Sequence, residues 1–376
     1  MQVKSKKEIS GSHRFAGLDH LRALAIVLVF LYHYRLFPHP LWVDKIGSFG
    51  WTGVDLFFVL SGFLISSQLF AKINNDGHFA LRSFYVKRAL RILPAYLTVL
   101  CIYFLWPGFR EWESLSPLWK FITFTQNIVL DLSRYRTFSH AWSLCIEEQF
   151  YLIFPIILLA FTRNGKNKTG VWLLGGLFLL GFFMRAFAWI KFVSPEINSG
   201  QVYKPWYEWI YYPTYSRLDG LLTGIAIGMW VQFFPKIKER MLRYGNLWLL
   251  AGLGLLTAAY FLCIQQLSFE ASVYGFPLIA VAYGVMVLSA LSPSSLLYKR
   301  GPKATAHIAI LSYSVYLTHK ALIHLTQKAL TEFGIENTST LTFFVCIITC
   351  FAGALILNRA IERPFLRYRD KITKHE

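Results

Sequence analysis

Two residues that can do chemistry lie eleven positions apart in one apolar stretch: Arg22 and His33 in "LDHLRALAIVLVFLYHY". Eleven helical steps of about 100° make three turns plus ~20°, so both side chains project from one face, roughly 16 Å apart along the axis. An arginine binds anions, and a histidine accepts a proton near neutral pH. Either residue alone also suits a membrane–water interface, where Arg22 would extend to the headgroups. Their shared face favours a common cavity, because a charge facing lipid is costly.

Acidic and hydroxyl side chains accompany them in the second and fourth apolar stretches. Asp55 opens the second, "GWTGVDLFFVLSGFLISS", at about the depth predicted for His33. The fourth, "HAWSLCIEEQFYLIFP", spaces Ser143, Glu147 and Tyr151 by four, which places them on one helix face. A carboxylate near His33 would form an acid–base cluster. The alternative for each carboxylate is a favourable charge at the start of a helix.

Three further stretches carry polar residues with two possible meanings each. Arg88 and Arg91 in "FYVKRALRILPAY" share a helix face and could bind phosphates, or simply mark the inner side of a membrane. Arg217 and Asp219 in "SRLDGLLTGIAIG" could form a structural ion pair or contact an acceptor. His319 in "LSYSVYLTHKALIHL" fits a packed, hydrogen-bonded histidine as well as a functional one.

Several familiar catalytic patterns are missing from the sequence. It has no glycine-rich phosphate loop, no G-x-S-x-G and no H-E-x-x-H, so hydrolases and nucleotide-hydrolysing enzymes are unsupported. The five cysteines lie in or beside apolar runs, at spacings unlike a metal site. We therefore predict that the cysteines are packed side chains and that the protein binds no metal.

The elements that must position these residues are membrane helices. The 376-residue chain is 55% hydrophobic and 15% charged, against roughly 25% charged for an average soluble domain. Apolar runs of about 20 residues recur, each long enough to cross a bilayer. The segment 118–132 is shorter and more polar, which predicts a helix lying at an interface. The sequence predicts an all-α polytopic transmembrane bundle of ten spans, at residues 18–37, 51–71, 84–105, 142–162, 170–192, 210–232, 246–266, 272–291, 304–328 and 340–361.

Lysine and arginine distinguish the two sides of the membrane. They concentrate before the first span, in the even-numbered loops and after the last span, which predicts that both termini are cytoplasmic. The formal charge of +18 reflects this bias and attraction to anionic lipids, so no nucleic-acid partner is predicted. The predicted organisation is a cytoplasmic segment 1–17, a transmembrane domain 18–362 and a basic cytoplasmic tail 363–376. Pro364 in "IERPFLRY" is predicted to end the last helix.

The order of these motifs resembles the acyltransferase 3 family of integral membrane acyltransferases, which is related to bacterial sugar and polysaccharide O-acetyltransferases. The resemblance covers nearly the whole chain. It rests on the Arg-x10-His of the first stretch, "GVDLFFVLSGFLIS", "RALR" before "ILPAY", "WSLCIEEQFYLIFP", "RLDGLLTG", "SYSVYLTH" and "IERP". One departure is His20, where the family's "LDGLR" has glycine, and it puts the backbone packing at that end in doubt.

The resemblance implies transfer of an acyl group, by default acetyl from acetyl-CoA, to a hydroxyl of a cell-envelope carbohydrate. Such acceptors include an O-antigen, a capsule or an exopolysaccharide, and the location implied is the bacterial inner membrane. The partners expected are acyl-CoA, a carbohydrate or glycolipid acceptor, and membrane lipids. The expected catalytic residues are His33, Glu147, Asp55 and Tyr151. The residues expected to bind coenzyme A are Arg22, Arg88 and Arg91. The residues expected to contact the acceptor are Ser143, Arg217, Asp219 and His319.

In the expected mechanism, His33 is the general base for the acceptor hydroxyl, assisted by Asp55 or Glu147. Direct transfer and a covalent acyl-enzyme on Ser143 both remain open. Because the chain stops about a dozen residues after its last span, we expect it to lack the extracytoplasmic SGNH-type esterase domain that some relatives carry. The main alternative is a transporter or flippase for an envelope glycan precursor, since intramembrane charges also suit transport. The acceptor could also be a lipid or a small secondary metabolite.

Overall fold

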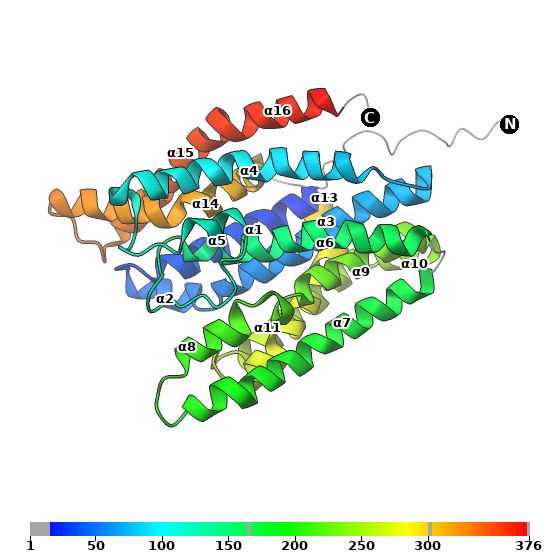
Figure 1. The fold of residues 1–376 in the computed structure, drawn as a ribbon, viewed down its shortest axis with the longest axis horizontal. Coiled ribbons are helices and arrows are strands. Elements are labelled where there is room, and N and C mark those ends of the chain that lie inside the picture. The colour runs from blue at the N-terminus through cyan, green and yellow to red at the C-terminus, as the bar shows by residue number, and fades with distance from the viewer. Residues whose placement is uncertain (1–15, 164–166, 300–302, 374–376) are drawn as a thin grey trace.

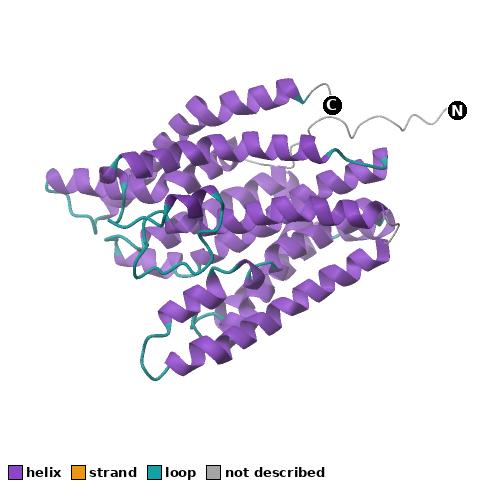
Figure 2. Cartoon of the chain, in the orientation of Figure 1, coloured by secondary structure: helices purple, strands orange, loops and turns teal. Residues whose placement is uncertain are grey.

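The computed structural model describes residues 16–163, 167–299 and 303–373. The regular structure of these residues is helical, apart from one isolated bridge between Leu115 and Thr137. Long helices run side by side in one bundle (Figures 1 and 2). The predicted all-α polytopic architecture is therefore confirmed. The predicted segment 1–17 lies outside the described residues as far as position 15.

Helices occupy all ten predicted positions. They are α1 (Ala16–Tyr34), α3 (Gly53–Asp76), α4 (Leu81–Leu105), α6 (Trp142–Arg163), α7 (Asn167–Ala188), α9 (Asp219–Phe233), α11 (Gly245–Leu262), α12 (Phe276–Leu291), α14 (Lys303–Glu332) and α15 (Thr340–Leu357). By length and hydropathy, eight helices of the described residues qualify as membrane spans, or nine if the sharply bent pair of α9 and α10 (Pro235–Leu242) forms one span. The predicted count of ten also includes α14, which is not among them.

Helix α14 is polar for a membrane helix because its side chains face other helices. It packs between α1 and α15, and Ser314, Thr318, His319 and Lys320 are all buried. Ser314 donates to Glu362 at 2.9 Å, for example. A buried polar group is tolerated when a neighbouring helix or backbone supplies its hydrogen bond. Summed hydropathy therefore understates how well α14 fits inside the bundle.

Helices α3 and α9 approach each other at glycines. A Cβ atom at Gly62 would overlap the backbone of Leu221, and one at Gly224 would overlap the backbone of Val59. Backbone atoms cannot move aside as a flexible side chain can, so these positions require glycine. Small residues at such contacts let membrane helices pack closely. The α3–α9 pair thus forms a tightly joined centre beside which the other helices are arranged.

The segment between α4 and α6 contains only short helical pieces. These are η2 (Pro107–Phe109), α5 (Leu118–Ile122) and η3 (Ser139–Ala141). The prediction of a helix at 118–132 is therefore correct for residues 118–122 and wrong for the rest. Phe124 and Val129 have φ values of 52° and 51°, which a right-handed helix does not accommodate.

The bundle has two distinguishable ends (Figure 1). The α3–α4 connection and α10 lie at one end, and α2 (Leu41–Gly47), α5 and α8 (Tyr203–Trp206) lie at the other. We call the first the basic end, because the helix ends that lie there carry many of the lysines and arginines that predict a cytoplasmic location. They include Lys72, Arg82, Lys87, Lys236 and Lys238.

The last helix continues past its predicted end. Helix α15 passes through the π-turn η9 (Asn358–Glu362) into α16 (Arg363–Ile372), which packs along α4 (Figure 1). The prediction that Pro364 ends the helix is wrong. Pro364 stands in the first turn of α16, where a proline is tolerated because its missing N–H is not needed. Glu362 is buried at this junction and accepts from Asn358 at 2.9 Å.

Candidate active site

A cavity lies among α1, α3, α4, α6 and α14, and its space together with its open mouth measures about 1090 Å³. Its lining changes along its depth. Arg22, Arg88 and Arg91 lie near the starts of α1 and α4, at the basic end. Ser143 and Tyr316 line the part farther from that end. We call this cavity the basic pocket.

Arg88 and Arg91 present their guanidinium groups at the mouth of the basic pocket. Arg88 donates to Gln68 Oε1 at 3.2 Å, and its guanidinium lies 5.6 Å from the ring centroid of Tyr151. Arg91 is exposed. Neither arginine forms a salt bridge within the described residues. The pair can therefore bind an anion without first releasing a carboxylate.

The two residues of α1 point into the interior of the bundle, both towards α14. Arg22 lines the basic pocket together with Ser312 of α14, and forms a salt bridge with Asp19 at 3.3 Å. His33 reaches His319 of α14. The first helix thus joins the basic pocket to a histidine cluster about three turns away.

Glu147 belongs to the basic pocket rather than to the surroundings of His33. Its Oε1 accepts from Ser61 at 2.9 Å and its Oε2 accepts from Tyr151 at 3.3 Å. Glu148 lines the same pocket. The predicted contact between Glu147 and His33 is not formed, because Glu147 lies one helical turn closer to the basic end than Ser143. The predicted alignment of Glu147 with Tyr151 is present.

Ser143 is hydrogen bonded to a tyrosine and not to a base. Tyr316 Oη lies 2.5 Å from the carbonyl oxygen of His140 and 2.6 Å from Ser143 Oγ. A carbonyl oxygen only accepts, so the single phenolic proton of Tyr316 goes to His140. Ser143 must then donate its own proton to Tyr316. No side chain in the described part of the chain is placed to remove that proton.

Three histidines form a cluster behind Tyr316, which lines the basic pocket, although none of the three lines that pocket itself. His319 Nδ1 lies 3.0 Å from the Val315 carbonyl oxygen and 2.9 Å from that of Tyr316, so Nδ1 carries the proton. In the neutral ring Nε2 of His319 is then an acceptor, and it receives Nδ1–H of His33 at 2.8 Å. This pattern assigns the tautomer of His33 and leaves its Nε2 free of a proton.

The third member of the cluster is His140. Its ring centroid lies 5.0 Å from that of His319 and 5.7 Å from that of His33. His140 is 2% exposed, yet neither of its ring nitrogens forms a hydrogen bond of good geometry within the described residues, although the ring lies beside the Tyr316 backbone. A buried imidazole without partners is costly, so a water or ligand group is expected to satisfy it.

A buried ion pair lies directly beyond the histidines. Lys320 Nζ is 3.0 Å from Glu111 Oε1, and both side chains are at most 1% exposed. The same carboxylate accepts the backbone N–H of Phe138 at 3.0 Å. Phe138 has a φ of 53°, an uncommon conformation for a bulky residue. Glu111 therefore helps to fix the turn that leads into His140.

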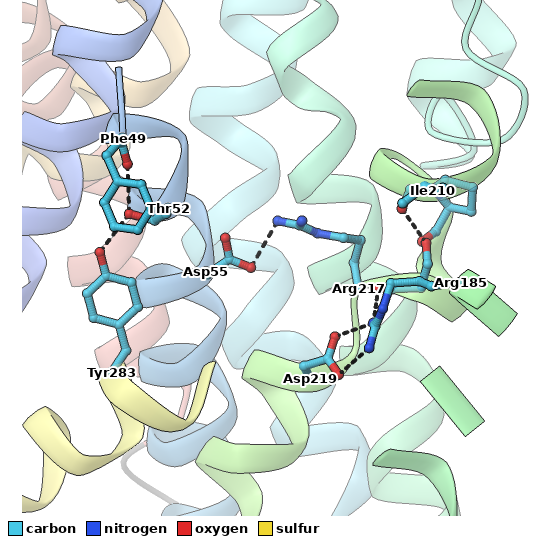
Figure 3. Close-up of polar contacts among 10 residues, drawn as sticks. Phe49, Thr52, Asp55, Arg185, Ile210, Arg217, Asp219 and Tyr283 are labelled. Atoms are coloured by element: carbon cyan, nitrogen blue, oxygen red, sulfur yellow. Dashed lines mark hydrogen bonds and ion pairs between the residues drawn. The ribbon is translucent and has the colours of Figure 1, made fainter. Parts of the chain in front are cut away.

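The other predicted acceptor contacts form two separate ion pairs (Figure 3). Arg217 donates to Asp55 at 2.9 Å, and Arg185 donates to Asp219 at 2.6 Å. Arg217 and Asp219 therefore do not pair with each other, which was one of the two alternatives, because each has another partner. Asp55 pairs with Arg217, and no contact with His33 is present among the described residues. The predicted contact through which Asp55 would assist His33 is therefore also not formed. Arg217 lies 4.0 Å from the ring centroid of Phe276, inside packed aromatic side chains.

Sequence reasoning missed three residues of this region: His140, Glu111 and Lys320. His140 is the first residue of the quoted stretch that carries Ser143, which was the available signal. Glu111 lies in an irregular segment without periodicity, so no local pattern indicated its place. The described residues contain no group of histidine, cysteine or acidic side chains that could hold a metal ion.

Comparison with known proteins connects this geometry to one class of enzyme. A family model described as an acyltransferase domain matches residues 15–359. The peptidoglycan O-acetyltransferase OatA of Listeria monocytogenes is 28% identical over 370 residues, covering 93% of this chain and 55% of its own length. The O-acetyltransferase OatA of Staphylococcus aureus is 28% identical over 372 residues, covering 93% and 56%. The chain thus spans just over half the length of these relatives. No solved structure matches significantly.

Proposed function

Because this chain belongs to the acyltransferase 3 family, we propose that it transfers an acetyl group from acetyl-CoA to a hydroxyl of a cell-envelope carbohydrate. The observation that carries the proposal is the hydrogen bond from His33 to His319, which lies behind Tyr316 of an arginine-lined pocket. This arrangement combines a site for an anionic donor with a base for a hydroxyl. The relatives named for O-acetyl transfer, one of them to peptidoglycan, support the choice of acyl group and acceptor class.

The donor is proposed to enter the basic pocket from the cytoplasm. Coenzyme A carries several phosphates, and Arg88 and Arg91 offer guanidinium groups that can bind phosphate bidentately. Arg22 would line the same entry. The pocket reaches from these arginines to Ser143, so a long donor bound by its phosphates would extend towards the histidine cluster. The donor supplies the activated acyl carbon.

His33 is proposed to act as the general base. Its Nε2 would take the proton of the acceptor hydroxyl as that oxygen bonds to the acyl carbon. The carbon–sulfur bond then breaks, and the proton held by His33 passes to the leaving thiolate. His319 would hold the His33 ring in the required tautomer, as a carboxylate does for a catalytic histidine elsewhere.

Direct transfer is favoured over a covalent intermediate on Ser143. An activated serine needs a base within hydrogen-bond reach of its hydroxyl. Ser143 instead donates to Tyr316, whose own proton goes to a carbonyl oxygen. Ser143 and Tyr316 are proposed to shape the end of the donor site.

The proposed location is the bacterial inner membrane, with the basic end facing the cytoplasm. The charge distribution over the connections supports this orientation. It would place acetyl-CoA on the side where it is made and the envelope carbohydrate on the other side.

The test compares His33→Ala with Arg88→Ala in purified membranes. Binding of coenzyme A and transfer of labelled acetyl to envelope glycans are measured separately. We expect His33→Ala to lose transfer by about 10²-fold to 10⁴-fold and to bind coenzyme A normally, whereas Arg88→Ala binds coenzyme A more weakly. Near-normal transfer by His33→Ala would refute the scheme. Export of labelled glycan that needs no acyl donor would instead support the transporter alternative.

A further inference from the structure

A second cavity lies at the end of the bundle opposite the basic end. It is an open depression whose space, including the part open to the surroundings, measures about 690 Å³, and we call it the distal pocket. Its lining comes from the segment after α1, from the segment after α4, and from the second half of α14 and the turn that follows it. The side chains that carry the argument are Phe37, Glu111, Trp112, His324, Lys328 and Asn337.

The distal pocket is joined to the histidine cluster by short stretches of chain. Phe37 follows His33 by four residues, and His324 follows His319 by five residues, or roughly 7.5 Å along the helix axis. Glu111, which lines the pocket, also contacts Lys320, the residue next to His319. The pocket therefore begins about one helical turn beyond the histidines, on the side away from the basic pocket.

The polar atoms of the distal pocket require hydrogen-bond donors. Glu111 Oε2 and Asn337 Oδ1 are buried and form no hydrogen bond of good geometry within the described part of the chain, although the Tyr103 hydroxyl lies beside Glu111. Both are acceptors, so a ligand with hydroxyl groups would satisfy them. A free anion is disfavoured, because the Glu111 carboxylate lines the wall. His324 and Lys328 can supply donors to the ring and hydroxyl oxygens of the same ligand.

The remaining wall is aromatic. Phe37 and Trp112 stack with ring centroids 5.8 Å apart. A sugar ring has apolar C–H faces together with several hydroxyls, and a pocket that combines aromatic and hydrogen-bonding side chains matches both properties. A lipid acyl chain would leave the two unpartnered oxygens without donors.

From these contacts we propose that the distal pocket binds the carbohydrate acceptor. This inference rests on the proposed function, and it identifies where the second substrate binds. The acceptor hydroxyl approaches His33 from the distal side while the acyl donor approaches from the basic side. His140 lies beside this route, and its ring nitrogens, which form no hydrogen bond of good geometry within the described residues, provide a contact for the incoming hydroxyl or its water. The bonds that form and break are those of the proposed transfer, in which the hydroxyl proton goes to His33 and then to the thiolate.

The test modifies the pocket after the protein has folded. Lys328→Cys is made in a Cys101→Ser background, because Cys101 is the exposed native cysteine and the other four are buried. Intact cells are treated with a bulky, membrane-impermeant methanethiosulfonate reagent. Base-labile labelled acetate in the envelope glycans is then counted, and coenzyme A binding is measured in membranes from the same cells. We expect modification of Lys328→Cys to reduce acetate incorporation at least tenfold without changing coenzyme A binding.

Two matched variants control the experiment. Lys45→Cys lies on α2 at the same end of the bundle, is exposed and does not line the distal pocket. It should react fully without loss of incorporation. His307→Cys lies on α14 itself but at the basic end, where it is exposed. It should react only after the membrane is opened.

The outcomes separate this inference from the function on which it rests. Complete modification of Lys328→Cys with incorporation within twofold of the untreated cells would overturn the acceptor site. If Lys45→Cys does not react with the reagent in intact cells and His307→Cys does, the proposal that the acceptor enters from the distal side is wrong. If cells with the unaltered protein incorporate no more acetate than cells lacking it, the proposed function itself fails.

Discussion

His319 determines which nitrogen of His33 is free to accept a proton. Its Nδ1 hydrogen is held by the backbone carbonyls of Val315 and Tyr316, so its Nε2 accepts from Nδ1 of His33 at 2.8 Å. As a result, Nε2 of His33 carries no proton and can accept one. A histidine thus takes the orienting position that a carboxylate occupies in many acid–base pairs, and it does so without placing a negative charge inside the membrane.

We predict that His319→Ala lowers the rate of acyl transfer by about 10²-fold or more, because His33 is then free to adopt the wrong tautomer. His319→Gln should restore part of the rate, since its side-chain oxygen can accept the same hydrogen bond. The measurement is kcat and KM for both substrates. A role limited to packing predicts no rescue by glutamine and an equal loss of thermal stability in both variants.

The two arginines of α4 should contribute to binding rather than to the chemical step. We predict that Arg88→Ala and Arg91→Ala each weaken coenzyme A binding by roughly tenfold to a hundredfold, from about 1.5–3 kcal/mol for a hydrogen bond to a charged group. Isothermal titration with coenzyme A in detergent measures the change. Arg240→Ala is the control, because Arg240 is exposed on α10 and lies outside the basic pocket. Equal effects of all three substitutions would indicate attraction by overall charge only.

The pair formed by Asp55 and Arg217 is predicted to be structural. Breaking a buried pair leaves one charge uncompensated, so Asp55→Ala and Arg217→Ala should each cost about 3–5 kcal/mol of unfolding free energy. The double variant should lose less than the sum of the two single variants. Thermal unfolding in detergent measures this, with Asp370→Ala, from an exposed pair with Arg369, as the control. If Asp55→Ala melts normally but cannot transfer acetyl, the result would instead support the predicted catalytic role of Asp55.

Glycine is predicted to be essential at position 62. A side chain there meets the backbone of Leu221, so Gly62→Ala should destabilise the protein by about 1–3 kcal/mol, as overpacking usually does. Gly175→Ala on α7 is the matched control, because nothing lies within 4 Å of its added Cβ. That change should be neutral or slightly stabilising, given the helix preference of alanine. Equal melting temperatures for the two variants would contradict the close contact of α3 and α9.

The short segment after α1 is expected to make a small, pH-dependent contribution to the free energy of unfolding. Hydrogen bonds from Arg35 and His39 lower the pKa of Asp44 below its ordinary value of 3.8. A lowered pKa in the folded state stabilises the protein above pH 3.8, and this contribution is lost as the pH falls through the folded pKa. The melting temperatures of the unaltered protein and Asp44→Asn should therefore differ at pH 6 and converge towards pH 3. A difference that grows on acidification would exclude this account.

The sequence predicted local features well and long-range partners poorly. Helical periodicity placed Arg22 and His33 on one face, and the spacing of four aligned Glu147 with Tyr151, because both depend on a single helix. The partners of Asp55 and Asp219 depend on how α3, α7 and α9 pack, which no spacing within one segment reveals. Glu111 and His140 belong to an irregular segment whose path follows from tertiary contacts, so neither could be placed beside His319 before the structure was known.

The glycine contacts between α3 and α9 also bear on how the protein changes shape. Two helices whose backbones touch have no side chains between them that could repack, so they are expected to move as one body. Helices α4 and α6 contact each other much less closely than α3 and α9 do, and both line the basic pocket. Any widening of that cavity for a large ligand should therefore occur by displacement of α4, with α16 carried along, against a stationary α3–α9 frame.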